Sequence, residues 1–518
     1  MDADVVIIGA GPNGLMLACE LGLAGLAPVV LEALPGPAEE PKANGLLGQV
    51  VKLVERRGLY ERIAGDPGPP RPTPSFPFAA MPLDLHRLDD NPVHTLAIPQ
   101  PRLVRILADR AAELGARFRW GHAMTGLAQD ADAVTVDVTG PDGPYRMAAR
   151  YLAGADGGHS VTRKQCGIGF PGVSYDRSML RWAHVSVPAD RVDAATGGLD
   201  VPGYGIVPPF LAQRTEHGGF TYAPLPGRPP IIATTELDQP VTDAPMTLAE
   251  LRDSIRRVLG ADVPVGPPDG DGPHLLRRRV GGSNRRAERF RDGRVFLLGD
   301  AAHVDAAGGQ GLNQGMQDAA NLGWKLAAAL RGDAPDGLLD TYDTERQLAA
   351  RRVTMYAQAL AALLAPGDDV TALRALFGEL LGDRDTVRRL AGLTAGTDVR
   401  YDMGAPGPHP LTGYSAPDLD LRTGTGPVRL ADLTRTARPL LLDLSGHGTL
   451  AAAMADWADR VDVLTATTTS DVTGLLLRPD CYVAWATSAP EPSEQDLAGL
   501  RDAAVRWFGV PVAGAVAP

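Results

Sequence analysis

The chain has 518 residues, a formal net charge of −12 at pH 7 and a pI of about 5.4. At roughly 100–200 residues per domain, this length predicts about three or four domains. The acidic balance argues against a nucleic-acid partner, which requires a basic face. A hydrophobic content of 44% with 22% charged residues predicts a globular protein with a substantial core.

Cysteine usage and the N-terminus indicate the compartment. Cys19, Cys166 and Cys481 are far apart and form neither a CxxC pair nor a metal-ligand spacing. This pattern is typical of a reducing cytoplasm and predicts no metal site. The first residues lack the basic segment of a signal peptide, and no apolar run approaches the ~18 residues of a membrane span. We therefore expect a cytoplasmic protein without a membrane partner.

The first 174 residues begin as a strand–helix–strand unit. Residues 5–8 are continuously apolar, as in a parallel strand buried on both faces, and helical spacing of apolar residues follows. With the strand "PVVLE", these elements form a βαβ unit. Helices are also predicted over 46–64 and 102–116. Short strands then alternate up to residue 156, with "GPDG" as a hairpin turn.

The next segments change character twice. Residues 175–279 read as a mostly antiparallel sheet with one helix, "TLAELRDSIRRVLG", inserted in the first domain. "GRVFLLGDAAH" restores the buried-strand pattern, and helices dominate to residue 395. The remainder, 396–518, is a Pro-rich linker followed by a small α/β domain. The predicted division is therefore 1–174, 175–279, 280–395 and 396–518.

A glycine-rich turn joins the first strand to the first helix. It reads Gly9-x-Gly11-x-x-Gly14: the first glycine makes the turn, the second admits a pyrophosphate and the third permits helix–strand packing. The helix N-terminus adds free N–H groups and the positive end of a dipole. Glu32 ends the second strand, at the offset of an acid that binds ribose hydroxyls. Because strand, helix and acid surround the motif, a dinucleotide site is favoured over a purely structural turn.

A second candidate site follows the apolar strand that ends before Asp156. Asp156 and Gly157 precede "SVTRK", a predicted helix start. The carboxylate either meets a cofactor at the strand end or caps this helix.

The third candidate site is "GDAAHVDAAGGQGLNQG". Asp300 ends a buried strand, where open α/β sheets bind ligands. Gly308, Gly309 and Gly311 leave backbone N–H groups uncovered before a helix, and such groups stabilise a ring edge that gains negative charge. The alternative is an ordinary loop with Asn313 as the N-cap.

The three motifs occur in the order found in class A flavoprotein monooxygenases of the para-hydroxybenzoate hydroxylase type, which the chain resembles. It is most similar to the bacterial aromatic polyketide and rifampicin-type hydroxylases, in "GRVFLLGDAAH", "GGQGLN", "QDAANLGWKLA", "PKANGL" and "RPDCYVAW". The resemblance covers nearly the whole chain. It implies an α/β fold with a Rossmann-like FAD domain, an inserted mostly antiparallel β-sheet substrate domain and a C-terminal thioredoxin-like α/β domain.

The resemblance also implies how FAD is held. The pyrophosphate would lie on the first glycine motif, the adenosine ribose at Glu32, the ribityl chain at Asp300 and the pyrimidine edge on 308–313. Gln100 would contact the flavin. The implied FAD-binding residues are Gly9, Gly11, Pro12, Gly14, Glu32, Ala33, Lys42, Gln100, Asp156, Gly157, Asp300, Gly308, Gly309, Gly311, Leu312 and Asn313.

The chain departs from these relatives in three places. Relatives usually read His-x-x-x-Pro-x-Gly-Gly beside the reacting flavin edge, whereas "HVDAAGGQG" has no proline and is about one residue shorter. Lys42 stands where relatives more often have Arg, which keeps the charge but not the planar fork. The C-terminal block has no CxxC, so it would be thioredoxin-like in shape only and serve for packing or dimerisation.

The implied activity is hydroxylation of a phenolic, polycyclic, polyketide-like substrate with O2 and NADPH or NADH, through a flavin C4a-hydroperoxide that the protein shields from water. Three alternatives stay open: Baeyer–Villiger-type oxygen insertion, hydroxylation that inactivates an antibiotic and, from another class, a catalytically degenerate flavin-binding module. The choice of monomer or homodimer is also open.

Three further features have uncertain roles. His217 and Tyr222, in "RTEHGGFTYAPL", are candidate catalytic bases if they face the cavity; a solvated or structural role is the alternative. His303 is predicted to be a packing residue. The basic stretch 277–286 either attracts nicotinamide phosphates or is a solvated charge run.

Overall fold

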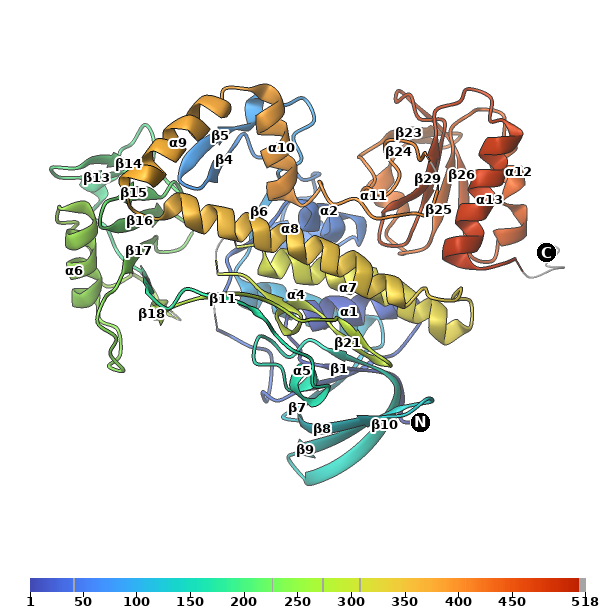
Figure 1. Cartoon of the computed structure of the whole chain (residues 1–518), viewed down its shortest axis with the longest axis horizontal. Coiled ribbons are helices and arrows are strands. Elements are labelled where there is room, and N and C mark those ends of the chain that lie inside the picture. The colour runs from blue at the N-terminus through green and yellow to red at the C-terminus, as the bar shows by residue number, and fades with distance from the viewer. Residues whose placement is uncertain (41, 226, 273, 307–308, 406, 512–518) are drawn as a thin grey trace.

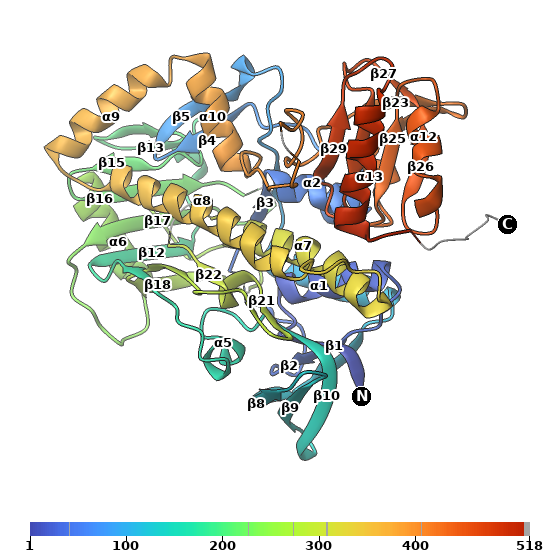
Figure 2. The same ribbon diagram turned by 45° about the vertical axis from the view of Figure 1, so that its right-hand side comes forward.

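The computed structural model describes residues 1–40, 42–225, 227–272, 274–306, 309–405 and 407–511. A central sheet with its helices is flanked by an inserted sheet on one side and a C-terminal unit on the other (Figure 1). The long helix α8 (Asp340–Leu364) runs between these flanks (Figure 2). At its start Glu345 contacts the C-terminal unit, and after its end the carbonyl of Ala365 accepts from Arg214 of the inserted sheet.

The central sheet is mainly parallel, in the order β20-β21-β10-β1-β2-β7, with β9 and β8 added antiparallel beside β10. Its strands are β1 (Ala3–Ile8), β2 (Val29–Glu32), β7 (Arg117–Trp120), β8 (Ala123–Gln129), β9 (Val134–Gly140), β10 (Gly143–Gly154), β20 (Arg291–Asp292) and β21 (Val295–Leu297). The predicted "GPDG" hairpin is confirmed, because Gly140 pairs with Gly143 across a two-residue turn.

The register of the parallel strands fixes where ligand-binding residues gather. Ile8 pairs with both Leu31 and Gly154, and Gly154 pairs with Leu297. The carboxyl ends of β1, β2, β10 and β21 therefore form one edge. All three predicted motifs, together with Glu32, lie on this edge, where open α/β sheets bind ligands.

Helices surround this sheet and extend beyond it. Those of the N-terminal unit are α1 (Pro12–Leu23), α2 (Gln49–Arg56), α3 (Tyr60–Ala64), α4 (Gln100–Glu113), α5 (Val161–Gln165) and α7 (Gly311–Arg331), and α8 is followed by α9 (Asp368–Leu380) and α10 (Arg384–Ala395). The helix predicted over 46–64 is two helices, because Gly58 adopts a φ of +67° between them. The helix predicted over 102–116 begins at Gln100 and ends at Glu113.

The inserted sheet is antiparallel, as predicted, in the order β15-β16-β17-β12-β18. These strands are β12 (Ser178–His184), β15 (Gln213–Thr215), β16 (Gly218–Ala223), β17 (Ile231–Leu237) and β18 (Leu276–Val280). Helix α6 (Leu248–Leu259) covers its outer face (Figure 2). A three-stranded sheet joins it to the core: β11 (Gly172–Ser174), β19 (Ser283–Arg286) and β22 (His303–Val304).

Short two-stranded sheets complete the first 400 residues. Two are hairpins, β4 (Ser75–Phe78) with β5 (Met81–Asp84) and β13 (Leu199–Val201) with β14 (Gly205–Val207), and a further two-stranded sheet pairs β3 (Gly45–Leu47) with the distant β6 (Thr95–Ala97). The predicted limits of the inserted domain fall just after β11 and within β18. We keep the four-part division of the chain as a proposal.

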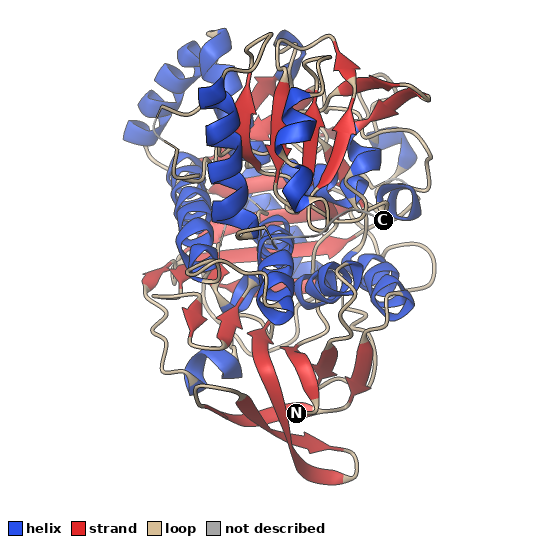
Figure 3. Ribbon diagram, turned by 90° about the vertical axis from the view of Figure 1, so that its right-hand side faces the viewer, coloured by secondary structure: helices blue, strands red, loops and turns tan. Residues whose placement is uncertain are grey.

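The C-terminal unit is a four-stranded sheet in the order β26-β25-β28-β29, with helices packed on it (Figure 3). Its elements are β25 (Leu440–Asp443), α12 (Thr449–Ala453), β26 (Asp462–Thr465), β28 (Gly474–Leu477), β29 (Val483–Thr487) and α13 (Glu494–Phe508), preceded by β23 (Asp420–Thr423), β24 (Gly426–Arg429) and α11 (Leu430–Leu433); β27 (Thr467–Thr468) pairs with β23. The first two strands are parallel and the last two form an antiparallel hairpin. This is the thioredoxin-like arrangement that was predicted.

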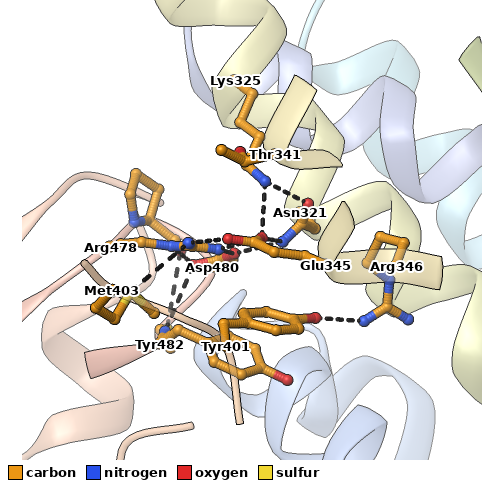
Figure 4. A network of polar contacts seen from close by, with 12 residues as sticks. Asn321, Lys325, Thr341, Glu345, Arg346, Tyr401, Met403, Arg478, Asp480 and Tyr482 are labelled. Carbon is orange, nitrogen blue, oxygen red and sulfur yellow. Dashed lines mark hydrogen bonds and ion pairs between the residues drawn. The ribbon is translucent and has the colours of Figure 1, made fainter. Parts of the chain in front are cut away.

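A buried charged cluster joins this unit to α7 and α8 (Figure 4). Arg478 binds both oxygens of Glu345, at 2.6 and 2.9 Å, and also pairs with Asp480. Lys325 donates to Glu345 and to Asn321, each at 2.8 Å. Removing one member of such a cluster leaves a buried charge unpaired, so the unit is held to the core by mutually dependent groups.

Within the described residues, no helix is both long enough and apolar enough to cross a bilayer.

Candidate cofactor site

The first glycine motif adopts the geometry that its sequence predicts. Gly9 has a φ of +102°, and a Cβ there would lie 2.6 Å from the carbonyl oxygen of Ala155. At Gly14 a Cβ would lie 2.1 Å from the carbonyl oxygen of Gly9, so only glycine lets α1 approach the strand. A Cβ at Gly11, by contrast, would meet nothing within 4 Å. Of the three, Gly11 alone faces open space.

The N-terminus of α1 beside that space is free. Gly11 is its N-cap, Pro12 occupies the first turn, and neither a capping side chain nor an acidic residue is present there. The unpaired N–H groups and the helix dipole therefore point at the space in front of Gly11, which fits a pyrophosphate.

Glu32 lies where the motif requires but is already hydrogen-bonded. Its Oε2 accepts from the N–H of Ala10 at 2.7 Å, and its Oε1 accepts from Leu34 at 2.9 Å. The carboxylate thus orders the glycine turn, and its remaining lone pairs are available for ribose hydroxyls. Ala33, the next residue, is exposed.

Asp156 mainly organises its own turn. Its Oδ1 accepts from Ser160, and its Oδ2 accepts from the backbone and side chain of Thr162. The N-cap of α5 is Ser160 and not Asp156, whose carboxylate supports the cap through Ser160 and Thr162. Gly157, with a φ of +78°, faces open space, so the backbone beside it stays accessible to a ligand.

Asp300 lies at the N-terminus of α7. A Cβ on Gly311 would lie 3.6 Å from Oδ1 of Asp300, so protein atoms crowd this carboxyl although the residue as a whole is exposed. The surrounding protein desolvates the carboxyl and raises its pKa, while His303 and Lys42 oppose that rise. Gly309, two residues before Gly311, has a φ of +63° and faces open space.

Asn13 brings the two glycine clusters into contact. A Cβ on Gly299 would lie 2.1 Å from its Nδ2, and one on Gly315 would lie 2.2 Å from the same atom. Residue 13 of the first motif therefore fits directly between the two glycines that flank the second. One elongated cofactor can reach both clusters.

The segment after β2 forms the third side of the crevice. Asn313 accepts from the N–H of Leu47 at 2.8 Å and donates to the carbonyl of Gly309 at 3.1 Å, which ties β3 to the start of α7. Gln100 donates its backbone N–H to the carbonyl of Ala43. Lys42 is exposed and pairs with Glu40 at 3.4 Å.

These features fit FAD. Helices α1 and α7 both begin without a side-chain cap, and Asn13 of α1 packs against Gly299 and Gly315 beside the start of α7. Buried side-chain oxygens of Asn13 and Asn44 have no hydrogen-bond partner among the described residues. Buried oxygens without a partner are expected where a polar ligand supplies the missing hydrogen bonds. The half-buried Leu312 packs against the core beside it. Gly308 lies outside the described residues.

The two candidate bases are not placed at this crevice. His217 is exposed in the turn between β15 and β16. Tyr222 is 2% exposed and packs with Phe220 and Ile255 in the core beneath α6, which corrects the expectation that it faces the cavity. A catalytic role for either residue stays a prediction that this geometry does not favour.

The other two uncertain features are clearer. His303 is fully buried, and its Nε2 lies 2.7 Å from Asp318. In the basic stretch, Arg277 pairs with Glu40 and Arg278 with Glu250, so both charges are already paired. Binding of nicotinamide phosphates there stays a prediction.

Sequence reasoning missed two residues that hold the motifs together. Arg163, one of the residues of "SVTRK", is 5% exposed and donates to the carbonyls of Ala301 and Gly158, at 2.8 and 2.9 Å. Asp318, in "QDAANLGWKLA", accepts from the N–H of Gly299 at 3.0 Å. Their contacts are with residues far away in the sequence, so no local pattern identified them.

Comparison with known proteins agrees with this geometry. The family model described as FAD binding domain matches residues 2–357, and that described as aromatic-ring hydroxylase, C-terminal, matches 409–511. A 12-dehydrotetracycline 5-monooxygenase/anhydrotetracycline 6-monooxygenase of Streptomyces rimosus is 43% identical over 99% of this chain and 100% of the relative. A rifampicin monooxygenase of Streptomyces venezuelae is 37% identical over 99% and 100%.

A solved structure shows the same architecture. The anhydrotetracycline hydroxylase of Streptomyces rimosus superposes with a TM-score of 0.85 at 40% identity, covering 99% of this chain and 100% of that one. The expected fold, the FAD cofactor and the monooxygenase class are confirmed. The chain belongs to the family of FAD-dependent aromatic-ring hydroxylases.

Proposed function

We propose that this enzyme hydroxylates a polycyclic phenolic substrate of the aromatic polyketide type, with NADPH or NADH as the electron donor and O2 as the oxygen source. The observation that carries the proposal is the contact of Asn13 with Gly299 and Gly315, which brings both glycine clusters close enough for one elongated cofactor to reach them. Relatives named for tetracycline-type substrates match this chain over its full length, which supports the substrate class.

When bound, FAD reduced by the nicotinamide activates O2 and supplies the oxygen atom that an electron-rich ring takes up. The chain's own residues position the cofactor and enclose the substrate. Gly11 and the start of α1 would bind the pyrophosphate, Glu32 the adenosine ribose, Asp300 the ribityl chain, and Gly309 to Asn313 the flavin ring. Arg163 and Asp318 hold the turn that carries Asp300.

The inserted sheet would enclose the substrate. Alternation along β12 puts Arg181 and Ala183 against α6 and Leu180 and Trp182 on the opposite face, which is turned toward the central unit (Figure 2). Leu180 and Trp182 are half-buried and supply an apolar surface for a flat aromatic ligand, and Arg277 and Arg279 of β18 lie beside them on the same face.

A second candidate function is hydroxylation of a finished antibiotic. The rifampicin monooxygenase relative, 37% identical over essentially the whole chain, favours it. The two functions share their chemistry and differ in the substrate that is turned over fastest.

The test uses purified, FAD-loaded enzyme with NADPH and with NADH. We expect nicotinamide oxidation to accelerate in the presence of anhydrotetracycline, with little H2O2 released, and one labelled oxygen atom from 18O2 in the product. Faster turnover of rifampicin would favour the second function. Bound FAD that neither nicotinamide reduces with either compound would support the degenerate flavin-binding module instead. Light scattering will decide between the proposed monomer and homodimer.

A further inference from the structure

Three segments converge at the end of β12 in the inserted sheet. Ala183 and Val185 belong to the core beneath α6, so His184 between them points to the opposite face, the same face as Trp182. The loop between β16 and β17 carries Arg228, and the segment before β18 carries His274. Although this corner lies on the proposed substrate side, none of the described contacts gives His184 an acceptor.

The protonation of His184 follows from one hydrogen bond. The backbone N–H of Leu275 donates to its Nδ1 at 2.9 Å, so Nδ1 carries the lone pair. In the neutral ring the proton is then on Nε2. Burial lowers the pKa of His184 to about 4, and the charges of Arg228 and His274 add to this, so the ring is neutral near pH 7. Nε2 is therefore a fixed donor.

This donor is buried without an acceptor. His184 is 2% exposed, and its Nε2 has no partner among the described residues; neither has Nη1 of Arg228, which is likewise closed to solvent. The His274 ring lies edge-on to His184 with 6.0 Å between centroids, and its Nε2 contacts the carbonyl of Gly270. The groups around His184 are thus basic or donating.

We propose that His184 and Arg228 form a subsite that binds an anionic oxygen of the substrate: a phenolate, enolate or carboxylate. An unpaired buried donor destabilises the protein, and an oxygen anion accepts from both groups at once while neutralising the guanidinium. Both atoms are closed to solvent in this structure, so binding of the anion requires the Arg228 side chain to move aside. Trp182 on the same face supplies an aromatic surface for the attached ring.

This subsite deepens the proposed function, since it specifies which edge of the aromatic substrate is recognised. It predicts that an acidic oxygen, and not the size of the ring system alone, selects the ligand. The subsite is therefore tested by comparing how tightly the enzyme binds an aromatic acid and the neutral amide of the same acid.

The experiment measures binding without turnover. FAD-loaded enzyme is titrated with 1-hydroxy-2-naphthoate and with its neutral carboxamide, followed by ligand fluorescence and calorimetry. We expect the acid to bind about tenfold more tightly, as a charge-assisted hydrogen bond predicts. Arg228→Gln should remove this preference. Arg256→Gln, on the exposed side of α6, is the matched control and should keep it.

Two substitutions of His184 separate recognition from structure. His184→Asn keeps an acceptor near Nδ1 for the N–H of Leu275 but removes the donor at Nε2. His184→Gln keeps a donor near Nε2 and weakens the contact to Leu275. We expect His184→Asn to lose the preference for the acid and His184→Gln to retain it. Bound FAD and a thermal melt show that each variant is folded.

Three results would overturn the subsite: equal binding of acid and amide by the wild type, no binding of either, or retention of the preference by His184→Asn with its loss in His184→Gln. The last would mean that His184 only holds Leu275. Suppose that the wild type binds the acid more tightly than the amide and yet oxidises nicotinamide without needing any aromatic compound. That combination would support the subsite and contradict the proposed function. Hydroxylation of an aromatic substrate by an enzyme that binds acid and amide equally would support the proposed function and contradict the subsite.

Discussion

Asp318 accepts a hydrogen bond from the backbone N–H of Gly299, 3.0 Å away, and so fixes the turn that carries Asp300. Its other oxygen accepts from Arg346 at 2.6 Å, and Arg346 donates to the hydroxyl of Tyr401 at 2.7 Å. Asp318 of α7 and Arg346 of α8 therefore hold this turn in place. The proposed ribityl contact depends on a buried ion pair that does not itself line the crevice.

Asp318→Asn tests this dependence. The substitution keeps the size of the side chain but leaves the buried guanidinium of Arg346 without its carboxylate, so we expect a loss of about 3 kcal/mol in the free energy of unfolding. With a weaker acceptor at Gly299, the dissociation constant for FAD should rise about tenfold. Urea unfolding and fluorescence of released FAD measure the two effects. Asp336→Asn, in the exposed loop before α8, should change neither; unchanged FAD affinity in Asp318→Asn would contradict the positioning role.

The same carboxylate predicts a pH dependence. Burial by itself would raise the pKa of Asp318, but Arg346 and His303 outweigh it and bring the pKa from 3.8 to about 2. A group with a depressed pKa stabilises the fold above its unfolded pKa and loses that contribution as the pH falls through the folded pKa. The lowered pKa of Asp318 corresponds to a contribution of about 2 kcal/mol to the free energy of unfolding. The stability gap between the wild type and Asp318→Asn should therefore narrow as the pH falls from about 4 to about 2; a gap that stays constant would contradict the assignment.

Two glycines of the first motif predict opposite outcomes. Gly11→Ala places a methyl group in the open space before α1, so the apoprotein should unfold at an unchanged urea concentration while FAD binding falls by at least tenfold. Gly14→Ala places its methyl group 2.1 Å from the carbonyl oxygen of Gly9, so stability itself should fall by about 3 kcal/mol. Comparing apoprotein unfolding with FAD titration separates the two. Equal effects of both substitutions would mean that Gly11 is structural too.

The motifs could be predicted because their geometry is local. Gly9, Gly11 and Gly14 follow a strand and open a helix within a few residues, and the sequence shows all three elements. The role of Asn13 could not be predicted, because its neighbours Gly299 and Gly315 lie some 300 residues later in the chain. Interactions across such separations depend on the packing of α1 against α7, which periodicity does not reveal.

Tyr222 shows a second limit. Alternation correctly puts Phe220 and Tyr222 on one face of β16. Which face meets α6 and which meets the cavity depends on how the helix of residues 248–259 docks, and nothing in β16 itself encodes this. The structural role that the sequence left as the alternative for Tyr222 is therefore the one that its packing beneath α6 favours, and the predicted strand is present.

A strained hairpin offers a stabilising substitution. Ala79 and Ala80 form the two-residue turn between β4 and β5 with φ values of 47° and 62°, where an alanine is disfavoured. Asn-Gly is the preferred pair in such a turn. Because Ala79 is 4% exposed in the core, only the half-buried Ala80 is changed, and Ala80→Gly should raise the free energy of unfolding by about 1 kcal/mol. Ala128→Gly, in the extended strand β8, should lower it; a stabilisation in both variants would disprove the turn-specific explanation.

Arg478→Met tests how the C-terminal unit is attached. Arg478 is fully buried, and its guanidinium lies 4.5 Å from the ring centroid of Trp507 while it binds Glu345 and Asp480. Without Arg478, the buried carboxylates of Glu345 and Asp480 keep only Lys325 and Asn321 as side-chain partners. We therefore expect the free energy of unfolding to fall by about 4 kcal/mol and hydrogen exchange in β28 and β29 to become faster. Arg501→Met, on the exposed side of α13, is the control. A loss below about 1 kcal/mol, with unchanged exchange in both strands, would mean that apolar packing alone attaches this unit to α7 and α8.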